Sequence, residues 1–471
     1  MGFAVSDIED QLAVLRRKIA RIDRKYAGGV PVPAPSDSRP APSDSRPAPS
    51  DSRPAAPDSR PAAPDSRAAP PDPRHAPTDI RPARYFIEQW MSGEVVTTPL
   101  GQHFETERLY ERHRRHGSMD ISSLIELPED LLGALSGGEV PAAPVERWAF
   151  LDTETTGLAG GSGTCAFLIG VGRVTPEGFR VRQFFMRDYG EEPSLLWALA
   201  EHLAGFDVLV TYNGKTYDQP LLETRYRMAR APTPFARLAH LDLLHGARRL
   251  WKLRLETCRL VDLENRILGV EREGDLPGEM IPYVYFEYLR TQQAWKVVPI
   301  FHHNAVDLLT TACLTGIVPF AFREPGAARF VHGADLVGLA RWFAHAGERE
   351  QALGLMRRAI DLGLPDALLF RTMWDAAAIE KRLGREAESL AVLRDLAASP
   401  NQYRMQAFEA LAKHYEHRER SYALALEMVR GARAIADSEH LRKRQARLEK
   451  RLAGRVKTAR LPLSPPPAPA G

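Results

Sequence analysis

Two acidic residues stand at the end of an apolar segment, at a spacing that favours metal chemistry. The segment WAFL, at 148–151, has the pattern of a buried strand, and Asp152 and Glu154 follow it one residue apart. Residues i and i+2 of a strand point to the same face, so both carboxylates would project together while Thr153 points into packing. Two adjacent like charges need water or a cation, and carboxylate oxygens suit Mg²⁺ or Mn²⁺. By itself the pair also fits a solvated strand end.

Two more acids and two histidines follow further along the chain. Asp218 lies beyond a predicted strand that breaks at Asn213, just before a predicted helix, and Asp307 opens the apolar helix NAVDLLTTACLTGIV. If that helix has already begun at His303, this histidine shares a face with Asp307, whereas His302 would sit in a loop and swing over the site. Both acids have a structural alternative, since each could simply offset a helix dipole. The four acids together favour a metal site.

The ordered motifs resemble those of DEDD-type 3′–5′ exonucleases, a family of the ribonuclease H-like superfamily. DTETTGL, at 152–158, is similar to the first exonuclease motif, the N-x3-Y-D segment at 213–218 to the second, and HHNAVD, at 302–307, to the third. The segments YNGKTYDQPLL, HLDLLHGARRLWK, DLPGEMIPYVYF and HNAVD resemble more closely a YprB-like bacterial subgroup, which often carries tetratricopeptide-like helices behind the nuclease domain. The resemblance covers about 84–435.

This resemblance implies a metal-dependent 3′–5′ exonuclease that hydrolyses phosphodiester bonds with two Mg²⁺ or Mn²⁺ ions, about 3.5–4 Å apart. A histidine near the site would take a proton from the attacking water. The histidine type of these enzymes selects His302 as this base, whereas the tyrosine type and the subgroup pattern HN-x2-D select His303, which we favour. The implied metal ligands are Asp152, Glu154, Asp218 and Asp307.

Substrate contacts are predicted in two places. The resemblance implies that Thr155, Gly157 and Leu158 contact the terminal nucleotide, with Leu158 wedged against a base; the alternative is an ordinary turn in which Gly157 supplies unusual backbone angles. Asn213 either binds substrate or orients the Asp218 loop, and an Asx-type turn is an equal alternative.

The second place is the segment 225–259, which has nine Arg or Lys and two acids. Within it, Arg248, Arg249 and Lys252 surround Trp251, and such a strip suits phosphate contacts with the indole stacked on a base. A solvated basic face with Trp251 in the core is the alternative. Asp242, one of the two acids in this segment, is a weaker candidate for supporting the metal site. The net charge of the whole chain, +3, is too balanced to indicate a partner.

The predicted fold is an α/β ribonuclease H-like domain at 146–325, a mixed central sheet flanked by helices. Strands are expected at 147–153, 165–174, 179–187 and 207–212, with helices at 192–204 and 218–230. A small accessory segment, 84–145, precedes the domain and contains a hairpin in EVVTTPLGQHFETERLYE. Residues 333–440 are expected to form tetratricopeptide-like helical repeats, with the poorest match at 373–398.

The chain ends have their own patterns. Residues 1–30 predict an amphipathic helix with heptad spacing, either docked on its own domain or self-associating. Residues 31–83 repeat PAPSDSR and PAAPDSR and predict a disordered linker, and 441–471 predict a disordered tail, first basic and then Pro-rich. Three widely spaced cysteines without a CxxC favour neither disulfides nor zinc, and they fit a cytoplasmic protein. We found no apolar run near the roughly 20 residues that span a bilayer, and expect no membrane partner.

Three functions therefore remain open. The first is a 3′–5′ exonuclease acting on DNA or RNA, which the residues do not distinguish. The second is a structure-specific endonuclease of the same fold. The third is a non-catalytic adaptor that binds nucleic acid and holds a protein partner through the helical repeats. An adaptor has no use for four acids, so we favour the exonuclease.

Overall fold

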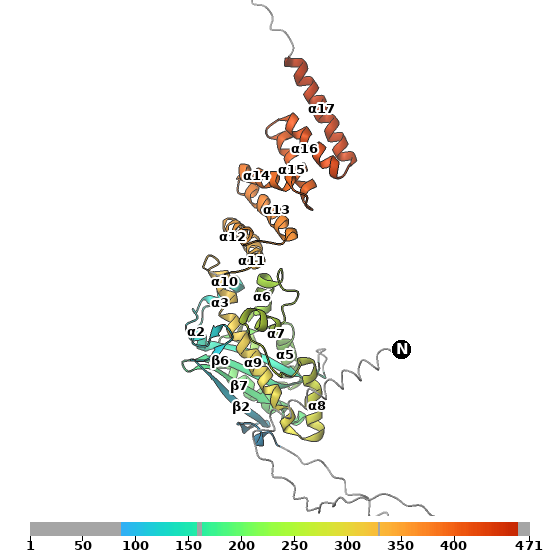
Figure 1. The fold of residues 1–471 in the computed structure, drawn as a ribbon. Helices are drawn as coiled ribbons and strands as arrows, with labels where there is room; N and C mark the ends of the chain where they lie inside the picture. Colours follow the sequence, from blue (N-terminus) through green and yellow to red (C-terminus); the bar gives the residue numbers. More distant parts are fainter. Residues whose placement is uncertain (1–85, 158–162, 328–329, 460–471) are drawn as a thin grey trace, which may run out of the picture. The chain divides into compact units, whose positions relative to one another are not determined.

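The computed structural model contains a seven-stranded mixed sheet with helices packed against it (Figure 1). The structure describes residues 86–157, 163–327 and 330–459. The predicted helix at 1–30, the linker at 31–83 and the Pro-rich end of the tail lie outside these residues. The strand order is β1-β2-β7-β6-β5-β8-β9, in which β5, β8 and β9 are parallel and the other neighbours are antiparallel. The sheet strands are β1 (Glu94–Thr98), β2 (Gly101–Glu111), β5 (Trp148–Thr155), β6 (Ala166–Thr175), β7 (Gly178–Phe185), β8 (Val208–Thr211) and β9 (Ala239–Asp242).

The mixed sheet flanked by helices confirms the predicted fold class. The four predicted strands correspond to β5, β6, β7 and β8, and β5, β6 and β7 form an antiparallel meander. The hairpin of the 84–145 segment is β1 and β2, and β2 pairs with β7 from Phe104 to Glu111. This segment therefore forms an edge of the central sheet. A small second sheet pairs β3 (Arg115–His116) with β4 (Met119–Asp120).

Strand β5 is buried on both faces because helices cover both sides of the sheet. Trp148 and Phe150 belong to one hydrophobic cluster, and Ala149 and Leu151 belong to another. Helix α9 (Val298–Thr315) packs against β5, β6 and β7. The other helices up to residue 323 are α2 (Ser122–Ile125), α3 (Leu131–Ser136), α4 (Glu192–Leu203), α5 (Asp218–Met228), α6 (Leu243–Trp251), α7 (Leu260–Leu263), α8 (Ile281–Thr291) and α10 (Val318–Arg323).

Helix α9 corrects one boundary of the sequence prediction. We expected the helix to open near Asp307, but it begins at Val298, where Pro299 stands in the first turn that accepts proline. Asp307 is therefore in mid-helix, and a charge there lies outside the terminal turn in which a helix dipole acts. The stretch Ala294–Arg323, which contains α9, is long and apolar enough to cross a bilayer by length and composition alone. Because 78% of its most apolar window is buried inside the protein, a core helix explains the same composition.

The C-terminal region is helical, and consecutive helices pack against each other. Its helices are α11 (Gly333–Ala346), α12 (Arg349–Asp361), α13 (Asp366–Arg382), α14 (Glu386–Ala398), α15 (Arg404–His417), α16 (Tyr422–Ile435) and α17 (Glu439–Ala459). Helices α11 and α12 and part of α13 share a hydrophobic cluster with the sheet domain, whereas another part of α13 packs with α14 to α17 in a separate one. The boundary near residue 330 thus does not separate two cores.

Helix α17 corrects the prediction of a disordered tail after residue 440. Its arginines pair with the buried carboxylate of Glu416, which accepts from Arg447 at 2.8 and 2.9 Å. Leu441 and Leu448 are also buried. The basic composition of this segment indicated a solvated tail. The sequence pattern does not show that its arginines pair with a buried acid, because that acid lies on another helix.

Candidate metal centre

The end of β5 brings Asp152 and Glu154 under helix α9. Both side chains are half-buried and lie on the sheet face that α9 covers, as the contacts below show. The apolar residues that precede them on this face, Trp148 and Phe150, are fully buried. The strand thus changes from apolar to acidic where the core gives way to solvent, which is the usual place for a ligand site on an open α/β sheet. We call Asp152, Glu154, Asp218 and Asp307 the carboxylate site.

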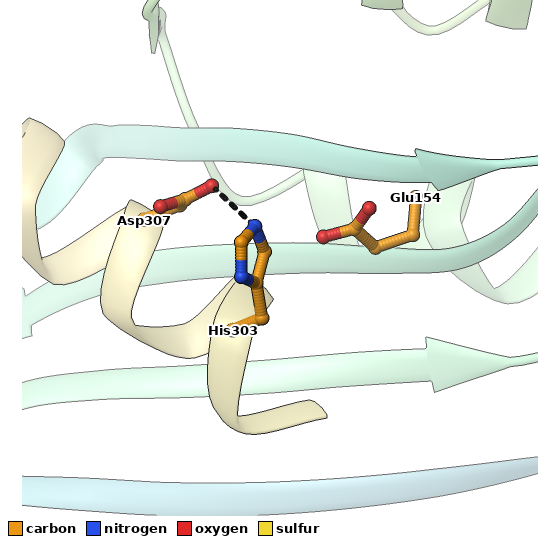
Figure 2. A group of neighbouring side chains, drawn as sticks. All are labelled: Glu154, His303 and Asp307. Carbon is orange, nitrogen blue, oxygen red and sulfur yellow. Dashed lines mark ion pairs between the residues drawn. The ribbon is translucent and has the colours of Figure 1, made fainter. Parts of the chain in front are cut away.

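Glu154 faces two residues of α9, His303 and Asp307 (Figure 2). One possible ligand atom from each of the three lies within 4.8 Å of the other two. His303 Nε2 is 3.5 Å from Asp307 Oδ2, as the i to i+4 spacing on a helix predicts. Their side chains are 14% and 17% exposed, so the group is reachable but poorly hydrated. Among the described residues this is the cluster with the geometry to hold a metal ion.

Asp152 is held by a row of hydrogen-bonded side chains that runs from Gln183 through Asn304 to Asp152. The Asn304 Nδ2 amide donates to Asp152 Oδ2 at 2.8 Å and to the Asp152 carbonyl at 3.2 Å. Asn304 is itself fixed by Gln183, whose Nε2 donates to Asn304 Oδ1 at 2.8 Å and to the Phe301 carbonyl at 2.8 Å. Asn304 is fully buried, so this arrangement fixes the direction of the Asp152 carboxylate.

A glycine makes room for this row. Gly170 on β6 pairs with Asp152 on one side and with Gln183 on the other. A Cβ at position 170 would stand 2.2 Å from Asn304 Oδ1 and 2.6 Å from Leu308 Cδ1. Only glycine therefore lets α9 approach β6 closely enough for Asn304 to reach Asp152.

Asp218 contacts β5 at Thr153, the residue between the first two acids. Thr153, which we expected in packing, instead donates its hydroxyl to Asp218 Oδ1 at 2.5 Å. Asp218 is the first residue of α5, as predicted. Burial raises the pKa of Asp218 to about 6, although the hydrogen bond from Thr153 favours the ionised form. The carboxylate thus lacks a full counter-charge from the protein itself.

The loop before Asp218 is held by Asp242, the residue that we treated as a weaker candidate. Its buried carboxylate accepts from the backbone N–H of Asn213 at 2.8 Å, of Lys215 at 3.1 Å and of Leu244 at 3.0 Å. Asn213 has a φ of 69°, a left-handed conformation that asparagine tolerates better than most residues. These contacts hold the loop by its backbone, and they leave the alternatives for the Asn213 side chain open.

His240 on β9 supports the same loop. Its Nδ1 is 2.5 Å from Gln219 Oε1, and its Nε2 is 2.8 Å from the hydroxyl of Thr211. Gln219 directly follows Asp218 in α5, so the contact ties the start of this helix to the sheet. Burial lowers the pKa of His240 to about 4, so the ring is neutral near pH 7.

The two candidate histidines occupy different faces of α9. His303 faces Glu154, whereas His302 is exposed. We expected His302 in a mobile loop that could swing over the site, but it lies in the second turn of α9. The loop position expected for His302 is therefore wrong, whereas its spacing to Asp307, which matches the histidine type, is unchanged.

The turn after the first two acids is only partly described. The Thr155 hydroxyl donates to the Gly157 carbonyl at 2.9 Å, and the pairing of β5 with β6 shifts register between Glu154 and Thr155. Gly157 has no positive φ, so the alternative in which it supplies unusual backbone angles is wrong. Leu158, the predicted wedge, lies outside the described residues.

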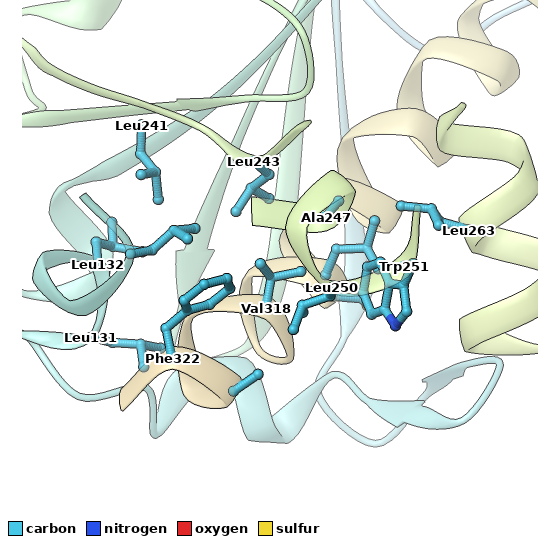
Figure 3. Packing of buried hydrophobic residues seen from close by; sticks show 14 of the residues in the cluster. Leu131, Leu132, Leu241, Leu243, Ala247, Leu250, Trp251, Leu263, Val318 and Phe322 are labelled. Carbon is cyan, nitrogen blue, oxygen red and sulfur yellow. The ribbon is translucent and has the colours of Figure 1, made fainter. Parts of the chain in front are cut away.

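The basic segment divides into buried, paired and exposed residues. Trp251 is 3% exposed and packs near Leu250, Leu263 and Val318 (Figure 3), so our prediction of a stacking indole is corrected to a core role. The helix periodicity of α6 turns Trp251 inward and leaves Arg248 and Arg249 exposed. Lys252, which caps the helix, is exposed as well. Other cations of the segment pair with acids, as Arg225 does with Glu192 and Arg259 with Asp262.

Several residues that shape the site were not among the predicted ones. Gln183 and Gly170 gave no local signal, because their role depends on the register of three strands. Asn304 stands inside the motif HHNAVD, and a buried asparagine next to a candidate base is a signal that could have been followed.

Comparisons with known proteins relate the sheet domain to a superfamily and the chain to a bacterial protein. A family model described as RNase_H superfamily matches residues 149–318, the span that holds all four acids and His303. The chain is also 33% identical over 312 residues to a protein of Bacillus subtilis (strain 168) named "Uncharacterized protein YprB". That similarity covers 64% of this chain and 74% of the Bacillus protein.

Proposed function

This chain belongs to the family of the Bacillus subtilis protein YprB and carries a ribonuclease H-superfamily domain, and on that basis we propose that it is a DEDD-type nuclease. The proposed reaction is metal-dependent hydrolysis of phosphodiester bonds from the 3′ end of a nucleic acid. The helices behind the sheet domain would correspond to the tetratricopeptide-like region of the subgroup. We further propose a cytoplasmic enzyme, in keeping with Cys165, Cys258 and Cys313, which are free and buried.

One observation carries the proposal: each of the four acids either belongs to a stretch of three consecutive residues of β5 or lies beside one of them. Asp152 and Glu154 belong to these residues, and Asp218 is bonded to Thr153 between them. Asp307 lies beside Glu154 through the group that includes His303. A structural role for such a cluster is difficult to justify, because like charges that are partly withdrawn from water destabilise one another.

The donor set fits divalent cations. Carboxylates with one neighbouring imidazole are ligands for Mg²⁺ or Mn²⁺, and the raised pKa of Asp218 indicates that added positive charge would be favourable there. Asp152, Glu154, Asp218 and Asp307 would hold the ions. Bound divalent cations supply Lewis-acid chemistry toward a phosphodiester.

The protein's own groups would then orient the reactants and move one proton. Asn304 and Gln183 fix the Asp152 carboxylate, and Asp242 and His240 fix the loop that carries Asp218. His303 would accept the proton of the attacking water as general base. The neighbouring carboxylates of Glu154 and Asp307 would stabilise the imidazolium that results.

Digestion of end-labelled substrates tests the proposal. Single- and double-stranded DNA and RNA, labelled at the 5′ end, are incubated with Mg²⁺ or Mn²⁺ and the full chain. A ladder shortened from the 3′ end, with mononucleotides released, is expected. Internal fragments would favour an endonuclease, and no cleavage of any substrate with either ion would contradict the proposal in favour of an adaptor.

A further inference from the structure

Two hollows meet between helices α6, α11 and α13. The first has a volume of about 700 Å³ and is lined by the end of α6 and by α11, and the second, of about 450 Å³, is lined by α11 and α13. Arg341 and His345 of α11 line both, so the two hollows are neighbours, and we call them together the basic groove. Its size is that of ligand-binding clefts in other proteins.

The charges of the basic groove are almost all positive. Its permanently charged cations are Arg248, Arg249, Lys252, Arg341, Arg371 and Arg382, and the acid in its lining is Asp375. Asp375 lies 3.1 Å from Arg371 and 3.8 Å from Arg341. Within the described residues Arg248, Arg249 and Lys252 form no ion pair, and all three are exposed. Such a concentration of uncompensated charge favours a polyanion, and guanidinium groups match phosphate oxygens in pairs.

The groove is built on a rigid contact between α6 and α11. A Cβ at Gly338 of α11 would lie 2.1 Å from the Arg249 carbonyl oxygen of α6. The backbones of the two helices therefore approach each other too closely for a side chain at this position. Arg254, beyond α6, holds the buried Asp335 of α11 through bonds of 2.8 to 3.1 Å. The relative position of the cations on α6 and α11 is therefore fixed.

The same helix α6 connects the groove to the carboxylate site. Its N-cap is Asp242, whose carboxylate holds the loop that leads to Asp218. Its other end carries Arg248, Arg249 and Lys252. The nine residues of α6 span about 13 Å at 1.5 Å per residue. At about 3.4 Å per nucleotide of a stacked strand, this is the length of roughly four nucleotides.

We propose that the basic groove binds the phosphate backbone of the substrate strand a few nucleotides away from the bond to be cleaved. The helical region then contributes directly to nucleic-acid binding through α11 and α13. This inference rests on the proposed nuclease function, because it takes the strand that reaches the groove to be the one whose end lies at the carboxylate site. An acidic protein partner would be an alternative polyanion, and the test includes it.

The test compares two full-length triple variants with equal loss of charge. The groove variant carries Arg249→Gln, Arg341→Gln and Arg382→Gln, one change on each helix. The control carries Arg112→Gln, Arg349→Gln and Arg418→Gln, which are exposed arginines outside the groove. Affinity for a labelled 20-nucleotide single strand is measured by fluorescence anisotropy in EDTA, at salt concentrations from 50 to 200 mM. Circular dichroism confirms that both variants are folded.

Loss of three phosphate contacts should reduce the steepness of log affinity against log salt by about 2. Between 50 and 200 mM salt, the fold-loss of affinity should therefore be roughly 20 times smaller for the groove variant than for the wild type. The control should keep the wild-type slope. Equal slopes for the groove variant and the control would overturn the inference. Binding of poly-glutamate is measured in the same way, and a groove variant that no longer binds poly-glutamate but still binds the strand would also overturn it. Because binding is measured without turnover, a wild type that binds through the groove but cleaves nothing with Mg²⁺ or Mn²⁺ would contradict the proposed function alone.

Discussion

The carboxylate site and the basic groove differ in how the chain assembles them. At the carboxylate site, charges of one sign are half-buried and each is held by a specific neighbour, such as Asn304 for Asp152 and Thr153 for Asp218. In the groove, charges of the opposite sign are mostly exposed and stand on three helices, and of the six cations Arg341 and Arg371 have a carboxylate neighbour, Asp375. Chemistry on a phosphodiester requires fixed directions, whereas attraction of a backbone requires only charge density. Single substitutions should therefore be severe at the first region and mild at the second.

The largest effect is expected from Asp152→Asn. The amide keeps an acceptor for Asn304 but removes the charge that would hold a cation, so cleavage should fall by at least about 10³-fold, equivalent to about 4 kcal/mol of transition-state stabilisation. Stability should not fall, because one of several crowded negative charges is removed. Initial rates with Mn²⁺ measure the first effect and thermal denaturation measures the second.

Asp361→Ala is the matched control for this prediction, because it removes an exposed acid of α12. It should cleave at the wild-type rate. If Asp152→Asn also kept the wild-type rate, Asp152 would not be a metal ligand, and the difference drawn between the two regions would lose its basis.

Trp251→Ala distinguishes the core role of this residue from a role in the groove above it. Removal of a buried indole should lower the free energy of unfolding by about 3–5 kcal/mol, measured by urea denaturation. The half-exposed Trp197, changed to Ala, should cost much less. A Trp251→Ala protein of normal stability with weakened strand binding would restore the stacking role that the sequence indicated.

Asn304→Ala tests whether the support of the carboxylate site matters as much as its acids. Asn304 touches Asp152 rather than the reacting atoms, so it is a positioning residue, and its loss should reduce metal affinity or activity by about 10- to 100-fold. The readout is the Mn²⁺ concentration that gives half-maximal cleavage, which a merely structural change would leave unaltered. Gly170→Ala should raise the same concentration, because its Cβ displaces the Asn304 amide.

The two regions also differ in how far the sequence could predict them. Strands β5 to β8 were predictable because they are short apolar runs bounded by turn residues, and the acids were found because each stands in a short local motif. The Asn304 contact depends on Gln183, 121 residues away in the chain, so no local spacing encodes it. The groove depends on α11 packing against α6, and Arg341 had no recognisable motif of its own.

The predictions for Trp251 and for helix α17 were wrong because both depend on contacts with distant parts of the chain. Trp251 was assigned to the surface because its neighbours in sequence are basic, but helix periodicity turns those neighbours outward and the indole inward. Helix α17 was taken for a disordered tail because its basic residues have few acidic neighbours nearby in sequence. Their acid, Glu416, lies on α15. Local composition fails wherever a distant helix supplies the packing or the counter-charge.

The smallest effect is a pH dependence of stability to which His240, beside the carboxylate site, contributes and the arginines of the groove do not. Burial lowers the pKa of His240 to about 4, while an unfolded chain would titrate near 6.5. Between these values the unfolded state binds the proton at position 240 more readily, so the contribution of His240 to the free energy of unfolding should be constant above about pH 6.5 and should fall as the pH drops toward 4. The raised pKa of Asp218 gives a contribution of the opposite sign below about pH 6. The contribution of His240 should be on the order of 1–3 kcal/mol.

Urea denaturation at pH 7, 6, 5 and 4 compares the free energy of unfolding of the wild type with that of His240→Gln. The fall toward low pH should be smaller in the variant. Some of it should remain, because burial also lowers the pKa of His202 to about 4. The groove triple variant should keep the full wild-type fall, because guanidinium groups stay charged throughout this range. An equal fall in wild type and His240→Gln would mean that the loop before Asp218 is not held by a neutral imidazole, and that the support of the carboxylate site is as insensitive to pH as the groove.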